Sequence, residues 1–267
     1  MKKNITLWII AFLITATSAI YQRLTGPTYP ISGIANISNS EINYKLDRSH
    51  GGEGDHLIKI DVPNEDIKGI LVWKRFKSHD QWENQEMDYQ NGQLIGILPH
   101  QPPAGKIIYH IELSKNEATI HIPNDEQNII RFKGDVPIWI LIPHVLVMFG
   151  AMFVSTRAGL EILSKQNSIR KLVAWTLGLS ILGGLIFGPL VQYYAFGALW
   201  TGVPFGWDLT DNKTLIAVIV WVIAWFRMKK SDNPYQVALI AAVVMLIVFL
   251  IPHSVLGSEI DHTKINN

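Results

Sequence analysis

The sequence predicts a membrane α-helical bundle of about five transmembrane helices, with an all-β domain inserted between the first and second helices. Two observations carry this prediction. The chain of 267 residues is 48% hydrophobic, and its apolar segments gather at the N-terminus and in residues 136–253. Most of its charge lies in residues 40–135, where short alternating segments are separated by turn residues. The chain therefore contains two parts that suit different solvents.

The first apolar segment, Ile5 to Ile20, follows Lys2 and Lys3. At about 1.5 Å per residue it is just long enough to enter and cross a hydrocarbon core. Residues 1–21 can be read as an uncleaved anchor or as a signal peptide cleaved near its small residues. Trp8 and Tyr21 occupy the positions of interfacial aromatic residues and favour the anchor. In both interpretations the chain from residue 22 onward lies outside the cytoplasm.

Four further apolar segments lie in the predicted transmembrane domain, residues 136–253: Val136–Val154, Leu172–Phe196, Thr214–Phe226 and Gln236–Ile251. Two of the connecting loops are rich in lysine and arginine, at residues 157–171 and 227–230. The positive-inside rule places both loops and the N-terminus in the cytoplasm. We therefore expect a multi-pass protein of the inner (plasma) membrane. Residues 22–135, the loop 198–213 and a C-terminal tail, residues 254–267, would lie outside the cytoplasm.

Residues 22–135 form the predicted extracytoplasmic β domain. Seven short alternating segments in it predict an antiparallel β-sandwich. The string "PPAGKIIYHIEL" resembles the corner of immunoglobulin-like and fibronectin-like domains, where a tyrosine, here Tyr109, opens a late strand. Trp73 would suit the core tryptophan of such a domain. The resemblance covers about 90 residues and concerns the fold, because such sandwiches carry unrelated functions.

Composition and motifs exclude several classes of function. The formal net charge is +1, which gives no electrostatic reason to expect a nucleic-acid partner. The absence of cysteine excludes disulfides, thiolate catalysis and cysteine-ligated metal sites. Six histidines lie in the β domain without a metal-ligand spacing, and the loop "RSHGGEGDH" is interpreted as a solvated turn. We assign no catalytic residue and no metal ligand, and a protein that is not an enzyme is favoured.

A polar segment, Trp207–Lys213, precedes the fourth apolar segment on the predicted outer side. Thr214–Phe226 alone would be about 20 Å long, which is too short to span the membrane, so the helix must begin inside this polar segment. Asp208 or Thr210 would then cap the helix, with Asp211 near its positive end. Lys213 would either snorkel to the interface or pair with a tail acid, Glu259 or Asp261.

Polar residues from several predicted spans lie at the same membrane level as this segment. Intramembrane polar groups are costly and usually have partners, so their convergence predicts a functional site. Its alternatives are helix capping for the acids, hydrogen bonding across the bundle for His144 and a simple helix end at His253. Gly184 and Gly188 would allow close helix packing, and Pro189 would kink the third span. The predicted binding residues are His144, His253, Trp207, Asp208, Asp211, Asn212 and Lys213.

The string "WTGVPFGWDLTDNKTLIAVIVW" resembles the tryptophan-rich outer loop of heme-handling proteins in cytochrome c maturation. In that family a Trp-Asp pair, here Trp207 and Asp208, precedes a span, and a histidine on each side supplies axial ligation. The resemblance implies heme as a cofactor with His144 and His253 as ligands. It covers about 20 residues, and this chain departs from the pattern at Phe205, in its number of spans and in its inserted β domain.

Three functions follow from this reading. The first is an accessory or assembly factor of the bacterial cell envelope, which would interact with the bilayer and with a membrane or envelope protein. The second is a membrane protein that binds heme or a quinone at the outer leaflet. The third is an ion-coupled transporter, which we rank last because the spans show no inverted repeat.

Overall fold

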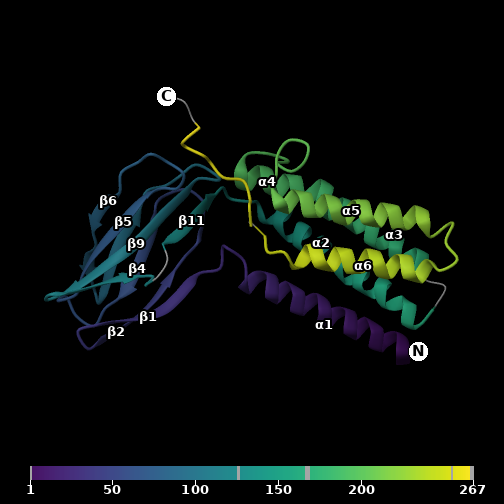
Figure 1. Ribbon diagram of the computed structural model, residues 1–267, viewed down its shortest axis with the longest axis horizontal. Coiled ribbons are helices and arrows are strands. Elements are labelled where there is room, and N and C mark those ends of the chain that lie inside the picture. Colours follow the sequence, from purple (N-terminus) through teal and green to yellow (C-terminus); the bar gives the residue numbers. More distant parts are fainter. Residues whose placement is uncertain (1, 125–126, 166–168, 254, 265–267) are drawn as a thin grey trace. The chain divides into compact units, whose positions relative to one another are not determined.

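A computed structural model describes residues 2–124, 127–165, 169–253 and 255–264 (Figure 1). The chain divides into two compact units. The helical unit contains Met1–Pro27 and Val136–Ser258, and the β unit contains Thr28–Asp135 and Glu259–Asn267. The predicted β-rich region between the first and second helices is therefore confirmed.

The helical unit consists mainly of five helical segments, one of which is interrupted. Its elements are α1 (Lys2–Leu24), α2 (Ile138–Leu160), the 3-10 turn η1 (Glu161–Leu163), α3 (Ile169–Ser180), the π-helix η2 (Ile181–Phe187), α4 (Gly188–Phe196), α5 (Leu209–Arg227) and α6 (Pro234–Leu250). Within the described ranges, four segments are long and apolar enough to cross a membrane. The fifth, α6, has 17 residues, which is about 25 Å of helix.

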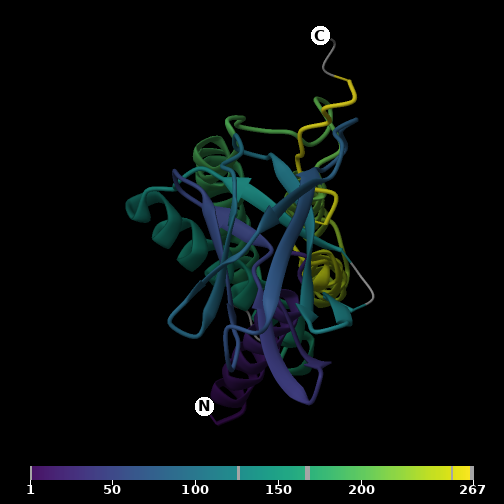
Figure 2. The same cartoon turned by 90° about the vertical axis from the view of Figure 1, so that its left-hand side faces the viewer.

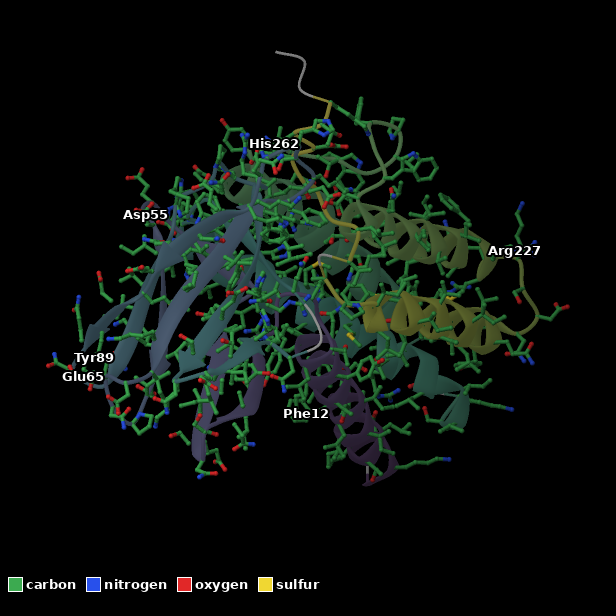
Figure 3. All side chains as sticks on the ribbon, turned by 60° about the vertical axis from the view of Figure 1, so that its left-hand side comes forward. Phe12, Asp55, Glu65, Tyr89, Arg227 and His262 are labelled. Carbon is green, nitrogen blue, oxygen red and sulfur yellow. The ribbon has the colours of Figure 1, made fainter. Side chains whose placement is uncertain are left out.

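Small residues line the contacts between these helices. Ala158, Ala224 and Ala241 are buried in the core of the unit, around the fully buried Trp221. Small side chains allow helix backbones to approach closely. The outer surface of the helices is apolar by contrast: Phe12, which projects from α1 in Figure 3, is 61% exposed. An apolar outer surface over a packed interior is compatible with a membrane protein.

Polar side chains connect the ends of neighbouring helices through hydrogen bonds and one ion pair. At one end, the buried Arg157 pairs with Glu161 (Nη1 to Oε2, 2.5 Å) and donates to Asn4 Oδ1 (2.6 Å). At the other end, Gln22 Nε2 donates to the carbonyls of Phe249 and Ile251, the latter at 3.2 Å. The start of α1 therefore lies beside the end of α2, and the end of α1 lies beside the end of α6.

The β unit contains three sheets in the part of the chain that the structure describes. The largest has the order β3-β11-β9-β5-β6, with β10 paired to β9, while β4-β8-β7 and β1-β2 form the others (Figure 2). The strands are β1 (Ile31–Ile37), β2 (Ser40–Leu46), β3 (Ser49–Gly51), β4 (His56–Asp61), β5 (Lys68–Arg75), β6 (Glu83–Glu86), β7 (Asp88–Gln90), β8 (Gln93–Leu98), β9 (Lys106–Lys115), β10 (Ala118–Ile122) and β11 (Asn128–Lys133).

One hydrophobic core receives side chains from all three sheets, including Ile42, Leu94 and Ile111. The alternation of β9 places Tyr109 in this core, and its hydroxyl donates to Asp47 O (3.2 Å). Trp73 is half-buried against the core. The period of two predicted for β9 is therefore confirmed, and it leaves every second side chain of this strand on the opposite face.

The C-terminal tail is divided between the two units after Ser258. Glu259 accepts hydrogen bonds from Lys106 Nζ (2.6 Å) and from Lys77 Nζ, and Ile260 N donates to Ala104 O (3.2 Å). Burial raises the pKa of Glu259, but the hydrogen bonds from Lys106 and Lys77 outweigh it and hold the pKa below its usual range. Residues 259–264 thus belong to the β unit.

Candidate functional site at the start of helix α5

Helix α5 begins inside the polar segment, as predicted, and Asp208 is its N-cap. Asp208 Oδ1 accepts from Thr210 N (2.8 Å), which satisfies one of the free amides of the first turn. Its other oxygen accepts from the backbone N and from the Oγ of Ser258, both at 2.8 Å. The cap therefore also holds the tail segment that follows α6.

Asp211 gathers the loop that precedes the helix. Its Oδ2 accepts from Thr201 N (2.6 Å), Gly202 N (3.0 Å), Gln192 Nε2 (3.1 Å) and Thr201 Oγ1 (3.3 Å). The side chain is buried, and so is that of Gln192 on α4. Next to it, Asn212 Oδ1 accepts from Val203 N (2.8 Å). The acid and the amide thus bind backbone N–H groups of the loop and tie α4 to α5.

The loop fits this position only because residue 202 is glycine. A Cβ atom at Gly202 would lie 2.6 Å from the Cβ of Asp211 and 2.8 Å from Asn212 Oδ1. Thr201 completes the connection, since its Oγ1 lies 2.8 Å from Ser258 Oγ. Helix α4, the loop, the start of α5 and the tail segment are therefore held by one hydrogen-bond network, which we call the α5 network: Gln192, Thr201, Gly202, Asp208, Asp211, Asn212 and Ser258.

Lys213 is 2% exposed and donates to Ile251 O (2.8 Å). This carbonyl follows the end of α6, where backbone acceptors lack helical partners. Glu259 binds Lys77 and Lys106 instead, and Asp261 accepts from Thr263. The tail ion pair predicted for Lys213 is corrected by these contacts: the ammonium caps a helix end.

His144 lies on α2 and contacts the irregular third segment. Its Nδ1 is 3.0 Å from Gly183 O, in the π-helix η2. This carbonyl also accepts from Gly188 N, one residue before Pro189. Pro189 has no N–H to continue an α-helical ladder, and a wider π turn accommodates its ring. Because a carbonyl can only accept, Nδ1 of His144 carries the proton, and the lone pair of Nε2 remains for another partner.

His253 has a similar arrangement just beyond α6. Its Nδ1 lies 2.8 Å from Gln22 Oε1, and the amide nitrogen of Gln22 is already used toward two carbonyls. Nδ1 is therefore the donor here too, and Nε2 keeps its lone pair. Crowding by surrounding protein atoms, and then the nearby charge of Lys213, lower the pKa of the His253 imidazole.

Two aromatic residues of the loop, Phe205 and Trp207, are largely exposed. Trp207 is 84% exposed and Phe205 is 81% exposed, while Trp200 Nε1 donates to Val203 O (3.1 Å). Trp207, which we predicted as part of the binding site, is exposed in this loop, and its binding role stays a prediction. Exposed tryptophan at the end of an apolar helix suits a membrane interface or a protein contact.

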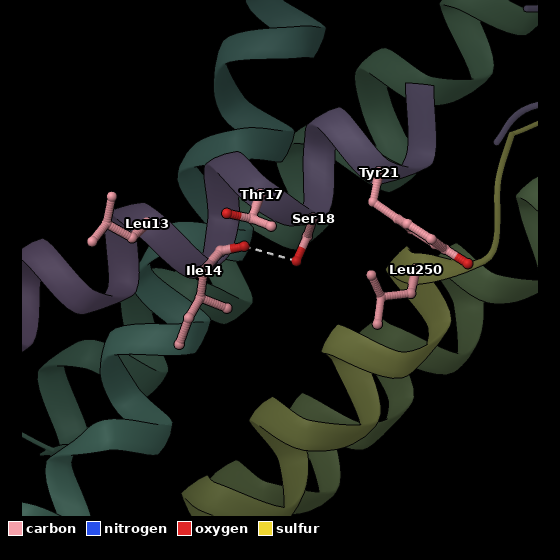
Figure 4. A pocket seen from close by; sticks show the side chains of 6 residues that line it. All are labelled: Leu13, Ile14, Thr17, Ser18, Tyr21 and Leu250. Atoms are coloured by element: carbon pink, nitrogen blue, oxygen red, sulfur yellow. Dashed lines mark hydrogen bonds between the residues drawn. The ribbon is translucent and has the colours of Figure 1, made fainter. Parts of the chain in front are cut away.

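An apolar groove of about 550 Å³ runs between α1 and α6. Figure 4 shows its lining residues, with Ser18 Oγ donating to Ile14 O (2.8 Å). Tyr21, one of the lining residues, directly precedes Gln22, which binds His253. No pattern in the sequence predicts this groove, because the apolar residues of α1 are spread around the helix and do not mark one face. The lining residues are Leu13, Ile14, Thr17, Ser18, Tyr21 and Leu250.

The predicted site residues thus fall into two groups by their hydrogen bonds. Asp208, Asp211 and Asn212 accept hydrogen bonds within the protein, whereas His144 and His253 each keep an imidazole lone pair. Such a nitrogen can accept a hydrogen bond or ligate a metal, but it cannot donate to a quinone carbonyl. Sequence reasoning missed Gln22, Thr201 and Ser258 as members of the site, since polar residues of these types occur throughout the loops. Comparison with known proteins finds no matching family model, no matching curated protein and no matching solved structure.

Proposed function

We propose that this chain is an accessory or assembly factor of the cell envelope, in which a helical membrane anchor presents a β domain to a partner outside the cytoplasm. The observation that carries the proposal is the engagement of Asp211, whose Oδ2 accepts four hydrogen bonds from the protein itself. A polar cluster whose hydrogen bonds are made within the protein holds helix ends and a loop in place. This is the interhelical network expected of an anchor and differs from the open acids of a proton-coupled carrier.

The proposal includes an orientation, with the N-terminus in the cytoplasm and with residues 22–135 and the C-terminus outside. It also includes an immunoglobulin- or fibronectin-like sandwich for the β domain. The basic loops and the positive-inside rule support the orientation. Cysteine scanning tests it cleanly, because the natural chain contains no cysteine. We expect a membrane-impermeant maleimide to label Glu65→Cys from outside and to label Asp232→Cys only after lysis. The reverse pattern would overturn the orientation.

The partner is tested by purification in a mild detergent. We expect the tagged full chain to recover one membrane or envelope protein in constant ratio. Phe205→Ala with Trp207→Ala removes exposed aromatic surface without touching the α5 network, and Tyr89→Ala does the same on the β unit. Loss of the partner in one of these variants would locate the contact. Recovery of the chain alone, under several detergents and after crosslinking, would contradict the assembly function.

Heme binding is the second candidate, because both imidazoles keep their Nε2 lone pairs while Nδ1 is fixed by a carbonyl oxygen. This second interaction is typical of histidines that ligate metals, in which it sets the tautomer. We expect a Soret band in protein from heme-supplemented cells, lost in His144→Ala and in His253→Ala but kept in His79→Ala. A colourless wild-type protein would exclude this candidate.

A transporter function receives the least support. Asp208 and Asp211 are the acids nearest the predicted bilayer surface, and both are held by the hydrogen bonds of the α5 network. A carrier would need to release and rebind a proton or cation at such a group. Uptake into proteoliposomes that depends on a pH gradient and is lost in Asp211→Asn would reverse this ranking.

A further inference from the structure

Two histidines and a glutamate converge on the face of the β unit that points away from its core. On β9, the buried Tyr109, Ile111 and Leu113 alternate with His110 and Glu112. Strand β10 pairs antiparallel with β9, and the register sets His121 directly opposite Glu112. Residues opposite each other in such a pair have neighbouring side chains. The hairpin thus collects three potential metal ligands on one face.

The distances between the ligand atoms of these three side chains are too long for hydrogen bonds but suit shared ligation of one metal ion. His110 Nε2 lies 3.6 Å and His121 Nδ1 lies 3.7 Å from Glu112 Oε1. One ligand atom from each residue lies within 4.8 Å of the other two. Hydrogen bonds of this type are about 2.7–3.2 Å long. Ligands at about 2.0–2.2 Å around a tetrahedral Zn²⁺ are about 3.4 Å apart, and the two distances to Glu112 Oε1 are close to this value.

The surroundings of His110 point in the same direction. Its Nδ1 is buried and has no hydrogen-bond partner within the part of the chain that the structure describes. The ring packs edge-on against Trp82 with centroids 5.6 Å apart, and Lys74 covers that indole at 5.1 Å. A half-buried imidazole without a conventional hydrogen bond is costly for the fold. An ion bound at Nε2, the ring nitrogen that lies 3.6 Å from Glu112 Oε1, would give this imidazole a strong interaction.

We propose that His110, Glu112 and His121 form a binding site for a divalent transition-metal ion of the Zn²⁺ class. Imidazole nitrogens with a carboxylate oxygen are ligands that Zn²⁺ prefers. Three protein ligands leave one position for water or for a side chain of a binding partner. The site lies wholly on the β9–β10 hairpin and is independent of the α5 network and of the function proposed above.

The test is metal binding by the full chain in detergent after treatment with a chelator and dialysis. Titration calorimetry with ZnCl₂ and elemental analysis should give one Zn²⁺ per chain. His121→Ala and Glu112→Gln should each weaken binding at least tenfold, and His79→Ala, which alters an exposed histidine elsewhere in the β unit, should leave it unchanged. Co²⁺ should give the visible absorption bands of a tetrahedral site, and these should vanish in His121→Ala.

His121 is the key position because its side chain is 55% exposed, so its replacement leaves the core intact. Circular dichroism of each variant verifies that the β unit remains folded. Absence of Zn²⁺ binding by the wild-type chain would overturn the proposal. Zn²⁺ binding that persists equally in His121→Ala and in Glu112→Gln would overturn it as well, since the ion would then be held by other histidines.

Discussion

Replacement of Asp211 by alanine tests the α5 network most directly. The change removes the acceptor of four hydrogen bonds, two of which, from Gln192 Nε2 and Gly202 N, are fully buried. A buried donor left without a partner costs about 1–3 kcal/mol. The two buried donors therefore predict a loss of about 2–6 kcal/mol. The two donors from Thr201 add less, because water reaches that residue more easily.

Thermal unfolding of the full chain in detergent, followed by circular dichroism, measures this loss. Asp211→Asn keeps an acceptor oxygen at the same place and should retain most of the stability. Asp232→Ala, which removes an acid from an exposed loop, is the matched control. If Asp211→Ala unfolds at the wild-type temperature, the hydrogen bonds do not stabilise the fold and our reasoning about the network fails.

The double variant Asp208→Ala with Asp211→Ala separates stability from binding. If the site binds a ligand or partner, that signal should fall further than the unfolding temperature does. If only the unfolding temperature falls while every binding signal survives, helix capping and loop fixation are the whole role of the two acids.

Three further outcomes are expected. Glu161→Ala should cost about 3–5 kcal/mol, since it leaves the charge of Arg157 buried without its partner; unfolding in detergent measures it. Gly202→Ala should also lower the unfolding temperature, because the added methyl group would overlap the side chain of Asp211. Glu259→Gln should destabilise the chain at neutral pH. Because the folded-state pKa of Glu259 is lowered, its stabilisation is present above the unfolded value of about 4.3 and is lost as the pH falls through the folded value.

Controls distinguish these outcomes from general damage. Joint replacement of Arg157 and Glu161 by methionine and leucine should recover much of the stability lost in Glu161→Ala, since no charge then remains buried. Glu65→Gln, which removes a carboxylate from an exposed turn of the β unit (Figure 3), is the matched control for Glu259→Gln. A stability difference between wild type and Glu259→Gln that persists unchanged at low pH would contradict the assigned role of this carboxylate.

The parts of the fold that depend on length and period were accessible from the sequence. The start of α5 followed from the shortness of Thr214–Phe226, and the cap followed from an acid at the right place. The inward face of β9 followed from alternation. The contacts that depend on distant pairing were not accessible. Glu112 and His121 are nine residues apart, and only the register of the β9–β10 hairpin makes them neighbours.

The count of basic residues in the predicted cytoplasmic loops included one arginine that is not exposed. Arg157 was read as a member of a basic cytoplasmic loop, yet it is 1% exposed and paired with Glu161 on the next turn. The pair i,i+4 was present in the sequence, but nothing local distinguishes a buried pair from a solvated one. The Nδ1 contacts of His144 and His253 were likewise hidden, because they depend on a π-helical carbonyl and on a glutamine of α1.

The division of the tail after Ser258 has a consequence for synthesis of the protein. The chain passes from one unit to the other after Pro27, after Asp135 and after Ser258. The bond between Lys106 and Glu259 closes a loop of 153 residues that contains four of the five helical segments. All strands of the β unit leave the ribosome long before this glutamate does. Its last contacts therefore form only after the intervening helices have been made, so the β unit is completed in two stages separated by the synthesis of the helical unit.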